Sequence, residues 1–151
     1  MVLEMFANKY RPKRLSEFHM DSDFYAVLSG LVQTGTLNLV LNGPSGSGKT
    51  SIMYALLKEY YGFDIPINHP NILKISILKE YSLSYFRSDI RNFCQTATTI
   101  PGKHKILMID DIDRINEQSQ QILRRYIDMY RHNVMFVMSC KDIYNVIDSI
   151  Q

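Results

Sequence analysis

The sequence has 151 residues and a mass of 17.6 kDa, with 46% hydrophobic and 21% charged residues, which suits one compact domain. Ten tyrosines and seven phenylalanines exclude an intrinsically disordered chain, and a net charge of +2 gives no global sign of a nucleic-acid binder. The longest apolar runs (106–109 and 134–138) are too short to span a membrane, and residues 1–9 carry no signal-peptide pattern. We therefore expect an intracellular protein that is not secreted and has no membrane partner.

Helical and extended patterns alternate along the chain, which is typical of an α/β layer fold. The chain is expected to begin with an extended basic arm (9–15) and a helix that Asp21 or Asp23 caps and that runs to Val32, before Gly35. Strands and helices are then expected to alternate. The strands are 37–42, 72–77, 105–109 and 134–139, and the helices are 49–61, 84–98 and 117–130. The strands are mostly continuous apolar runs, so they predict a mostly parallel sheet covered by helices on both faces.

Two helices have inner faces that the spacing of apolar residues defines. For the helix over 84–98 these residues are Phe86, Ile90, Phe93 and Ala97, and for the helix over 117–130 they are Ile122, Leu123, Tyr126, Ile127 and Tyr130. The only two cysteines, Cys94 and Cys140, have no metal-ligand or disulfide spacing, so we expect buried thiols.

A phosphate-binding motif lies between the first predicted strand and the next helix. Its residues are Gly43, Pro44, Ser45, Gly46, Ser47, Gly48, Lys49 and Thr50, which fit the pattern of glycine, four residues, glycine, lysine and serine or threonine. Glycines let successive backbone N–H groups point inward at phosphate oxygens, and the helix directs its positive end at the same anion. Lys49 supplies a positive charge for the β- and γ-phosphates, and the Thr50 hydroxyl is a ligand for Mg²⁺. The alternative, an ordinary Gly/Ser turn, does not require this strand–loop–helix context, so we expect nucleoside triphosphate binding.

Two carboxylates follow the strongest predicted strand. Residues 106–109 are all apolar, and Asp110 and Asp111 come directly after them. Binding sites of open α/β sheets lie at the carboxyl ends of the strands, so Asp110 is predicted to hold Mg²⁺ and Asp111 to orient or deprotonate the attacking water. The alternative is a strand followed by a simple acidic turn.

Further stretches decide which branch of the phosphate-loop proteins fits. The base-reading Asn-Lys-x-Asp motif of GTPases and the Leu-Ser-Gly-Gly-Gln signature of transporters are absent, and no lid of a small-molecule kinase is evident. Residues 9–12 (KYRP), 43–50 (GPSGSGKT), 106–111 (ILMIDD), 120–125 (QQILRR) and 149–151 (SIQ) together resemble the small subunits of the clamp loader, the replication factor C family of AAA+ ATPases.

This resemblance implies a fold, a function and roles for single residues. The implied fold is a three-layer P-loop NTPase (AAA+) core over 21–151, preceded by an arm over 1–20, with the lid and collar domains of the family absent. The implied function is an ATP-binding subunit of a hetero-oligomer that loads a sliding clamp onto primer–template DNA at the site of replication, in eukaryotes the nucleus. The implied nucleotide contacts are Tyr10, Arg11, Pro12, the loop through Ser51, and Lys141. Arg87 is implied to contact DNA phosphates, and Arg124 and Arg125 a neighbouring subunit.

Three departures from the family pattern affect the expected chemistry. Asp111 replaces the usual glutamate, which shortens the reach of the carboxylate by about 1.5 Å. Lys141 falls where the family has an asparagine, and an ammonium group cannot accept a hydrogen bond from water. The sequence also stops at Gln151, before the expected arginine finger, so we expect a shortened chain that binds ATP but hydrolyses little of it alone.

Several interpretations remain open from sequence. The chain is either a weakened ATPase or a non-hydrolysing scaffold subunit in which ATP fixes the shape of the assembly, and a small-molecule kinase is a third hypothesis. The basic arm contacts nucleotide, a subunit or nucleic acid, and Tyr10 either stacks on a base or packs beneath the first helix. Arg87 is either a phosphate contact or a solvated helix residue.

Overall fold

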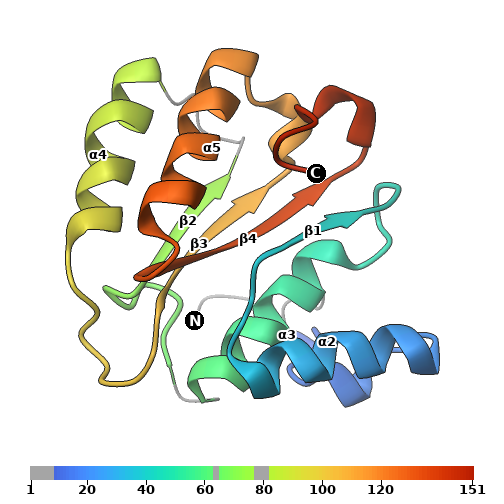
Figure 1. Ribbon diagram of the computed structural model, residues 1–151. Helices are drawn as coiled ribbons and strands as arrows, with labels where there is room; N and C mark the ends of the chain where they lie inside the picture. Colours follow the sequence, from blue (N-terminus) through green and yellow to red (C-terminus); the bar gives the residue numbers. More distant parts are fainter. Residues whose placement is uncertain (1–8, 63–64, 77–81) are drawn as a thin grey trace, which may run out of the picture.

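The computed structural model of the chain describes residues 9–62, 65–76 and 82–151. Figure 1 shows a layered α/β arrangement with helices on both sides of one sheet. The helices are α2 (Ser22–Thr34), α3 (Lys49–Tyr61), α4 (Leu83–Gln95) and α5 (Glu117–Tyr130), with short 3₁₀ turns η1 (Leu15–Glu17), η2 (Ile112–Arg114) and η3 (Ile143–Asn145). The strands are β1 (Leu39–Asn42), β2 (Ile72–Ser76), β3 (Lys105–Asp110) and β4 (Val134–Cys140).

The four strands form one parallel sheet in the order β1-β4-β3-β2. In the register of the ladder, Asn42 pairs with Cys140 and Ser76 pairs with Asp110. Because all strands run the same way, their carboxyl ends meet at one edge of the sheet, which Figure 1 shows as the arrowheads. This confirms the predicted fold class and brings the ends of β1, β3 and β4 together.

The sheet separates two hydrophobic cores. Ile106 and Met108 of β3 pack in the core that α2 and α3 cover, whereas Leu107 and Ile109 pack in the core of α4 and α5. Side chains of a strand alternate between faces, so a strand buried on both faces must be apolar at every position. This is why the apolar run over 106–109 indicated a central parallel strand.

Local capping defines the ends of α2. The side chain of Asp21 accepts a 2.8 Å hydrogen bond from the backbone N–H of Asp23, and Gly35 ends the helix in the left-handed conformation with φ of 68°. Both are ordinary termination signals, and they confirm the helix that the sequence predicted after Asp21. The helices predicted over 49–61 and 117–130 are likewise confirmed at both ends.

The helix predicted over 84–98 is shorter than expected, because α4 ends at Gln95. Lys105 donates hydrogen bonds to Phe93 O (2.6 Å) and to Thr96 Oγ1 (2.5 Å), and Asn133 donates one to Cys94 O (2.8 Å). These side chains satisfy the last carbonyl groups of the helix from outside it, which stops the helix there. The predicted inner face was therefore wrong at its end, since Cys94 is buried in the core and Ala97 is exposed.

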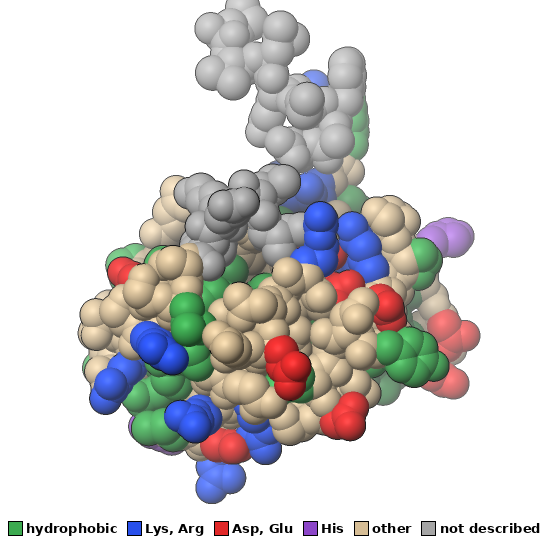
Figure 2. Space-filling view, turned by 90° about the horizontal axis from the view of Figure 1, so that it is seen from above, with side chains coloured by type: hydrophobic (Ala, Val, Ile, Leu, Met, Phe, Trp, Pro, Cys, Tyr) green, Lys and Arg blue, Asp and Glu red, His purple; other side chains and the backbone are tan. Residues whose placement is uncertain are grey.

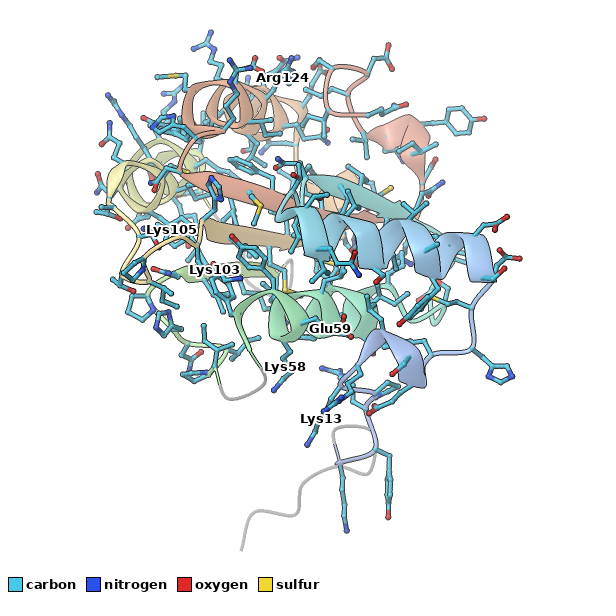
Figure 3. All side chains as sticks on the ribbon, turned by 60° about the horizontal axis from the view of Figure 1, so that its bottom comes forward. Lys13, Lys58, Glu59, Lys103, Lys105 and Arg124 are labelled. Carbon is cyan, nitrogen blue, oxygen red and sulfur yellow. The ribbon has the colours of Figure 1, made fainter. Side chains whose placement is uncertain are left out.

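The arm was predicted to be extended over 9–15. Arg14 is extended, with φ of −119° and ψ of 150°, and the 3₁₀ turn η1 begins at the last residue of the predicted arm, Leu15. The side chain of Leu15 is fully buried, and its N–H donates a 2.7 Å hydrogen bond to Glu59 Oε1 on α3. Figure 3 shows Lys13 of the arm on the same side of the molecule as Lys58 and Glu59 of α3. The arm is thus fixed to the outer side of α3.

Both cysteines are free and buried, as predicted, with Cys94 and Cys140 in the core beneath α4 and α5. Within the residues that the structure describes, none of the helices has the length and apolar character needed to cross a bilayer.

Candidate functional site: a nucleotide-binding cleft

A cleft of about 340 Å³ lies at the edge of the sheet where the strands end. It is lined by Ser45, Gly46, Gly48, Lys49, Thr50, Ser51, Asp111 and Lys141. The loop after β1 and the start of α3 supply the first six residues, and the residues directly after β3 and β4 supply the last two. The sheet therefore brings together two motifs that are some 60 residues apart, as the sequence predicted.

The loop between β1 and α3 has the backbone that phosphate binding requires. Gly46 and Gly48 have φ of 78° and 88°, in the left-handed region that side chains with a Cβ adopt at a cost. Helix α3 starts at Lys49, directly after this turn, and the first N–H groups of an α-helix have no partner within the helix. The turn therefore directs unpaired N–H groups and the positive end of a helix into the cleft, where an anion is stabilised.

The Lys49 side chain folds back over the loop. Its Nζ donates hydrogen bonds to Gly43 O (2.6 Å) and Pro44 O (2.8 Å), and the residue is only 9% exposed. Among the described residues, no carboxylate forms an ion pair with Lys49. Its described hydrogen-bond partners are therefore neutral groups, the two carbonyl oxygens and the Ser47 hydroxyl at 3.5 Å, which leaves its charge available for a phosphate group.

Asp110 is held at the end of β3 by two hydroxyl groups. Thr50 Oγ1 donates to its carboxylate at 2.9 Å, and Ser139 Oγ on β4 donates to Oδ1 at 2.6 Å. Ser139 is fully buried and was missed by the sequence analysis, because a serine in an apolar strand carries no motif. The strand pairing identifies it, since β3 and β4 are adjacent.

The residues around Asp110 fit a magnesium ion. Thr50 and Asp110 offer a hydroxyl and a carboxylate oxygen, which are ligands that Mg²⁺ prefers, and the two lie within 3.1 Å of each other. The described part of the chain has no cluster of three or more His, Cys, Asp or Glu side chains that would hold a metal without further ligands. Mg²⁺ at this site would therefore need phosphate oxygens and water as well, as is usual for Mg²⁺ bound with a nucleotide.

Asp111 adopts an unusual backbone conformation. Its φ of 55° and ψ of 55° make it the one residue other than glycine with positive φ in the described ranges. The N–H of Asp111 donates a 3.1 Å hydrogen bond to Ser139 Oγ, which helps to hold this conformation. Aspartate tolerates the left-handed region better than most residues, which gives a local reason for aspartate at the position where the family has glutamate.

Lys141 forms an ion pair with Asp111 across the cleft. Its Nζ lies 3.6 Å from Asp111 Oδ2, and the side chains are 38% and 16% exposed. A pair that is exposed to this extent contributes at most about 1 kcal/mol to stability. The two residues in which the sequence departs from the family pattern are thus partners of each other.

The residues predicted to contact adenine lie outside this cleft. The Arg11 guanidinium stacks 5.1 Å from the ring centre of Tyr54 on α3, and Lys74 donates a hydrogen bond to the Tyr54 hydroxyl. Tyr10 is 69% exposed rather than packed beneath the first helix. Tyr10, Arg11 and Pro12 are not among the residues that line the cleft, and their contact with a base stays a prediction.

A second cavity, of about 410 Å³, lies in the groove between α4 and α5. Arg87 is exposed and lines it, and its contact with DNA stays a prediction. Two arginines that the sequence did not group with it also line the groove: Arg91 on α4 and Arg125 on α5. Figure 2 shows several Lys and Arg side chains on the left of the face it views, others above its centre, and most Asp and Glu side chains from the centre to the right. The groove therefore concentrates positive charge in a chain of nearly neutral net charge.

The two arginines predicted at a subunit interface differ in their surroundings. Arg124 forms an ion pair with Asp128 one turn further along α5, and Figure 3 shows it on the side of the sheet opposite Glu59. Arg125 instead lines the α4–α5 groove with Arg87 and Arg91. The interface roles of both residues stay predictions.

The fold and the cleft define a P-loop nucleotide-binding domain, in which a glycine-rich loop, a lysine and a hydroxyl residue meet an aspartate at the end of a parallel strand. Residues 39–151 match the family model of the ATPase family associated with various cellular activities (AAA). The chain belongs to the AAA family.

Sequence comparison gives more specific relatives. The chain is 32% identical to replication factor C subunit 4 of Oryza sativa subsp. japonica over 148 residues, which cover 97% of this chain and 43% of that protein. It is 32% identical to the replication factor C small subunit of Methanocella arvoryzae, covering 98% and 45% of the two chains. The resemblance to replication factor C that the motifs implied is thus confirmed, and the chain spans less than half the length of these relatives.

Solved structures share the fold at low sequence identity. A DNA polymerase III gamma subunit-related protein from Thermotoga maritima has a TM-score of 0.67 and 14% identity, over 82% of this chain and 42% of that one. The RuvB Holliday junction branch migration motor of Thermotoga maritima has a TM-score of 0.66 and 20% identity, over 93% and 45% of the chains.

Proposed function

We propose that this chain is the nucleotide-binding domain of a clamp-loader small subunit, which binds ATP with Mg²⁺ in the cleft between the loop, β3 and β4. The observation that carries the proposal is the Lys49 ammonium, held over the loop by Gly43 O and Pro44 O without a carboxylate partner among the described residues. Thr50 and Asp110 would hold Mg²⁺, which would shield the charge of the phosphates. Identity to replication factor C subunits over nearly the whole chain supports the same reading.

In this proposal the chain acts within a hetero-oligomer where DNA is replicated. A sliding clamp and primer–template DNA would be its partners, and Arg87, Arg91 and Arg125 would contact phosphates of the DNA backbone. Phosphate contacts read no base sequence, which suits a protein that must act at every primer. Arg124 would face a neighbouring subunit, as the family motif implies, and the same interface role for Arg125 is the alternative to its DNA contact.

Hydrolysis is proposed to be slow in this chain. Asp111 would orient the attacking water, but its side chain is shorter than that of glutamate and is paired with Lys141. This ion pair favours the second candidate function, a scaffold subunit in which bound ATP fixes the shape of the assembly. Replacing Asp111 with glutamate in the assembled complex separates the two: turnover rises for a weakened ATPase and stays at zero for a scaffold.

Nucleotide binding is tested with Lys49→Ala in the 151-residue chain, measured by titration with a fluorescent ATP analogue and Mg²⁺. We expect a loss of affinity of about a hundredfold or more, because a charge-assisted contact in a partly desolvated site is removed. Arg131→Ala is the matched control, since Arg131 is exposed, directly follows α5 and does not line the cleft. Retained micromolar affinity in a folded Lys49→Ala variant would overturn the site assignment.

A further inference from the structure

A second group of positive side chains lies where the arm crosses α3. The Arg11 guanidinium of the arm lies 5.1 Å from the ring centre of Tyr54 on α3, and Lys74 Nζ of β2 lies 4.8 Å from the same ring centre. Figure 3 shows Lys13 and Lys58 on this side of the molecule. We call this group the arm surface, and its basic residues are Lys9, Arg11, Lys13, Arg14, Lys58 and Lys74.

Two carboxylates contact the arm, and both accept hydrogen bonds from its backbone. Glu17 Oε2 accepts a 2.8 Å hydrogen bond from the N–H of Lys13, and Glu59 Oε1 accepts one of 2.7 Å from the N–H of Leu15. Neither ion pair between described residues includes Glu17 or Glu59. Six basic side chains thus share the arm surface with two carboxylates that bind the backbone. Such an excess of positive charge attracts a polyanion.

Tyrosine rings hold three of the cations of the arm surface. Lys9 Nζ lies 5.6 Å from the ring centre of Tyr10, and the Tyr54 ring contacts both Arg11 and Lys74. The negative face of an aromatic ring attracts a cation, but the ring has no net charge with which to neutralise it. The rings therefore position these side chains and leave their full charge available for an anion such as a phosphate group.

Tyr10 gives the arm surface an exposed aromatic ring among its basic residues. Tyr10 is 69% exposed and lies between Lys9 and Arg11 in the chain. Proteins that bind single-stranded nucleic acid combine positive groups with aromatic rings, because unpaired bases stack on the rings while the phosphates meet the cations. A base within a duplex is already stacked on its neighbours, so it gains nothing from such a ring. The ring therefore favours a single strand over a duplex as the polyanion.

We propose that the arm surface binds single-stranded nucleic acid, with Tyr10 stacked on an unpaired base and with Lys13, Lys58 and Lys74 at the phosphates. Tyr54 packs on the core beneath α2 and α3, whereas the side chains of the α4–α5 groove pack on the core of the other face of the sheet. One chain thus offers two basic surfaces on opposite faces of the sheet, the groove for the backbone of a duplex and the arm surface for an unpaired strand. This goes beyond the proposed function, which assigns DNA contacts to the groove alone.

The test is the fluorescence anisotropy of a labelled oligo-dT strand and of a labelled duplex, each titrated with the 151-residue chain at several salt concentrations. Replacing Lys13, Lys58 and Lys74 together with glutamine should lower the slope of log single-strand affinity against log salt by about 2, since each phosphate contact contributes about 0.7. Tyr10→Ala should weaken single-strand binding about tenfold and duplex binding less than about twofold, and Tyr10→Phe should retain most of the affinity. Arg114→Gln is the control, because Arg114 is exposed and lies in η2.

Three outcomes would overturn the proposal. The first is an unchanged salt slope in the triple lysine variant, or an equal loss of single-strand affinity in the groove variant Arg87→Ala with Arg91→Ala, which would place the strand in the groove. The second is a Tyr10→Ala variant that loses affinity for an ATP analogue but not for oligo-dT, which would assign Tyr10 to the nucleotide, as the family motif implies. The third is a chain that binds polyglutamate through these lysines but not oligo-dT, which would make an acidic protein segment the partner. Thermal unfolding of each variant excludes a folding defect.

Discussion

Ser139 on β4 donates a 2.6 Å hydrogen bond to Oδ1 of Asp110 on β3 and accepts a 3.1 Å hydrogen bond from the N–H of Asp111. One buried hydroxyl thus holds both acidic residues that follow the apolar run of the central strand. It sets the position of the proposed magnesium ligand and the backbone conformation of the proposed water-orienting residue at the same time.

We expect Ser139→Ala to lower the free energy of unfolding by about 1–3 kcal/mol, because it leaves a carboxylate oxygen and a backbone N–H without this partner. Urea denaturation measures the change, and Ser88→Ala serves as the control because Ser88 is an exposed serine in α4. The variant should also weaken Mg²⁺-dependent nucleotide binding. A loss of stability no larger than that of the control would contradict the role assigned to Ser139.

The backbone at Asp111 makes a second prediction about stability. With φ of 55°, a residue with a Cβ carries a cost of about 1–2 kcal/mol that glycine does not. Asp111→Gly should therefore be more stable than Asp111→Ala by about 1 kcal/mol in denaturant unfolding. Equal stability of the two variants would mean that the left-handed conformation is not retained.

The groove between α4 and α5 is tested by the salt dependence of DNA binding. Replacing Arg87, Arg91 or Arg125 with alanine should weaken binding of any duplex sequence and lower the slope of log affinity against log salt by about 1 for each arginine that binds a phosphate. Fluorescence anisotropy at several salt concentrations measures both. Arg114→Ala is the control, since Arg114 is exposed and lies outside the groove. An unchanged slope in the triple variant would exclude the groove as a DNA-binding surface.

The buried thiol of Cys94 is expected to make the folded state less stable at alkaline pH. Burial raises the pKa of this thiol to about 12, against the opposing effect of the Lys105 ammonium. An unfolded cysteine has a pKa of about 8.5, so the folded state binds more protons above that pH and loses stability as the pH rises toward 12. Below about pH 8.5 the contribution is fully present.

Comparison of Cys94→Ala with wild type isolates this contribution. The slope of unfolding free energy against pH between about 9 and 10.5 should be less negative in the variant, by up to about 1.4 kcal/mol per pH unit. Lys105, whose pKa is lowered by burial, is present in both proteins and has the opposite sign. Identical slopes would show that the thiolate is accommodated in the folded state.

The sequence predicted the loop, the strand over 105–109 that leads to Asp110, and the parallel sheet, because each depends on local pattern. It missed Ser139 and the true end of α4, since both depend on contacts between segments far apart in the chain. Lys105 and Asn133 end α4 from the starts of β3 and β4, and no spacing within residues 84–98 reveals them. The ion pair between Asp111 and Lys141 could not be predicted from the sequence either, because the two residues meet only through the adjacent positions of β3 and β4 in the sheet.

The alternation of β3 between two cores has a consequence for how this protein tolerates change. Inserting or deleting one residue between Lys105 and Asp110 would reverse the direction of every later side chain, exchanging Met108 with Leu107 or Ile109. It would also move Asp110 by one pleat relative to Thr50 and Ser139. The length of this strand is therefore constrained by the packing on each of its two faces and by the cleft at its end. Conservative exchanges of apolar side chains within the strand keep both faces packed and leave the cleft unchanged.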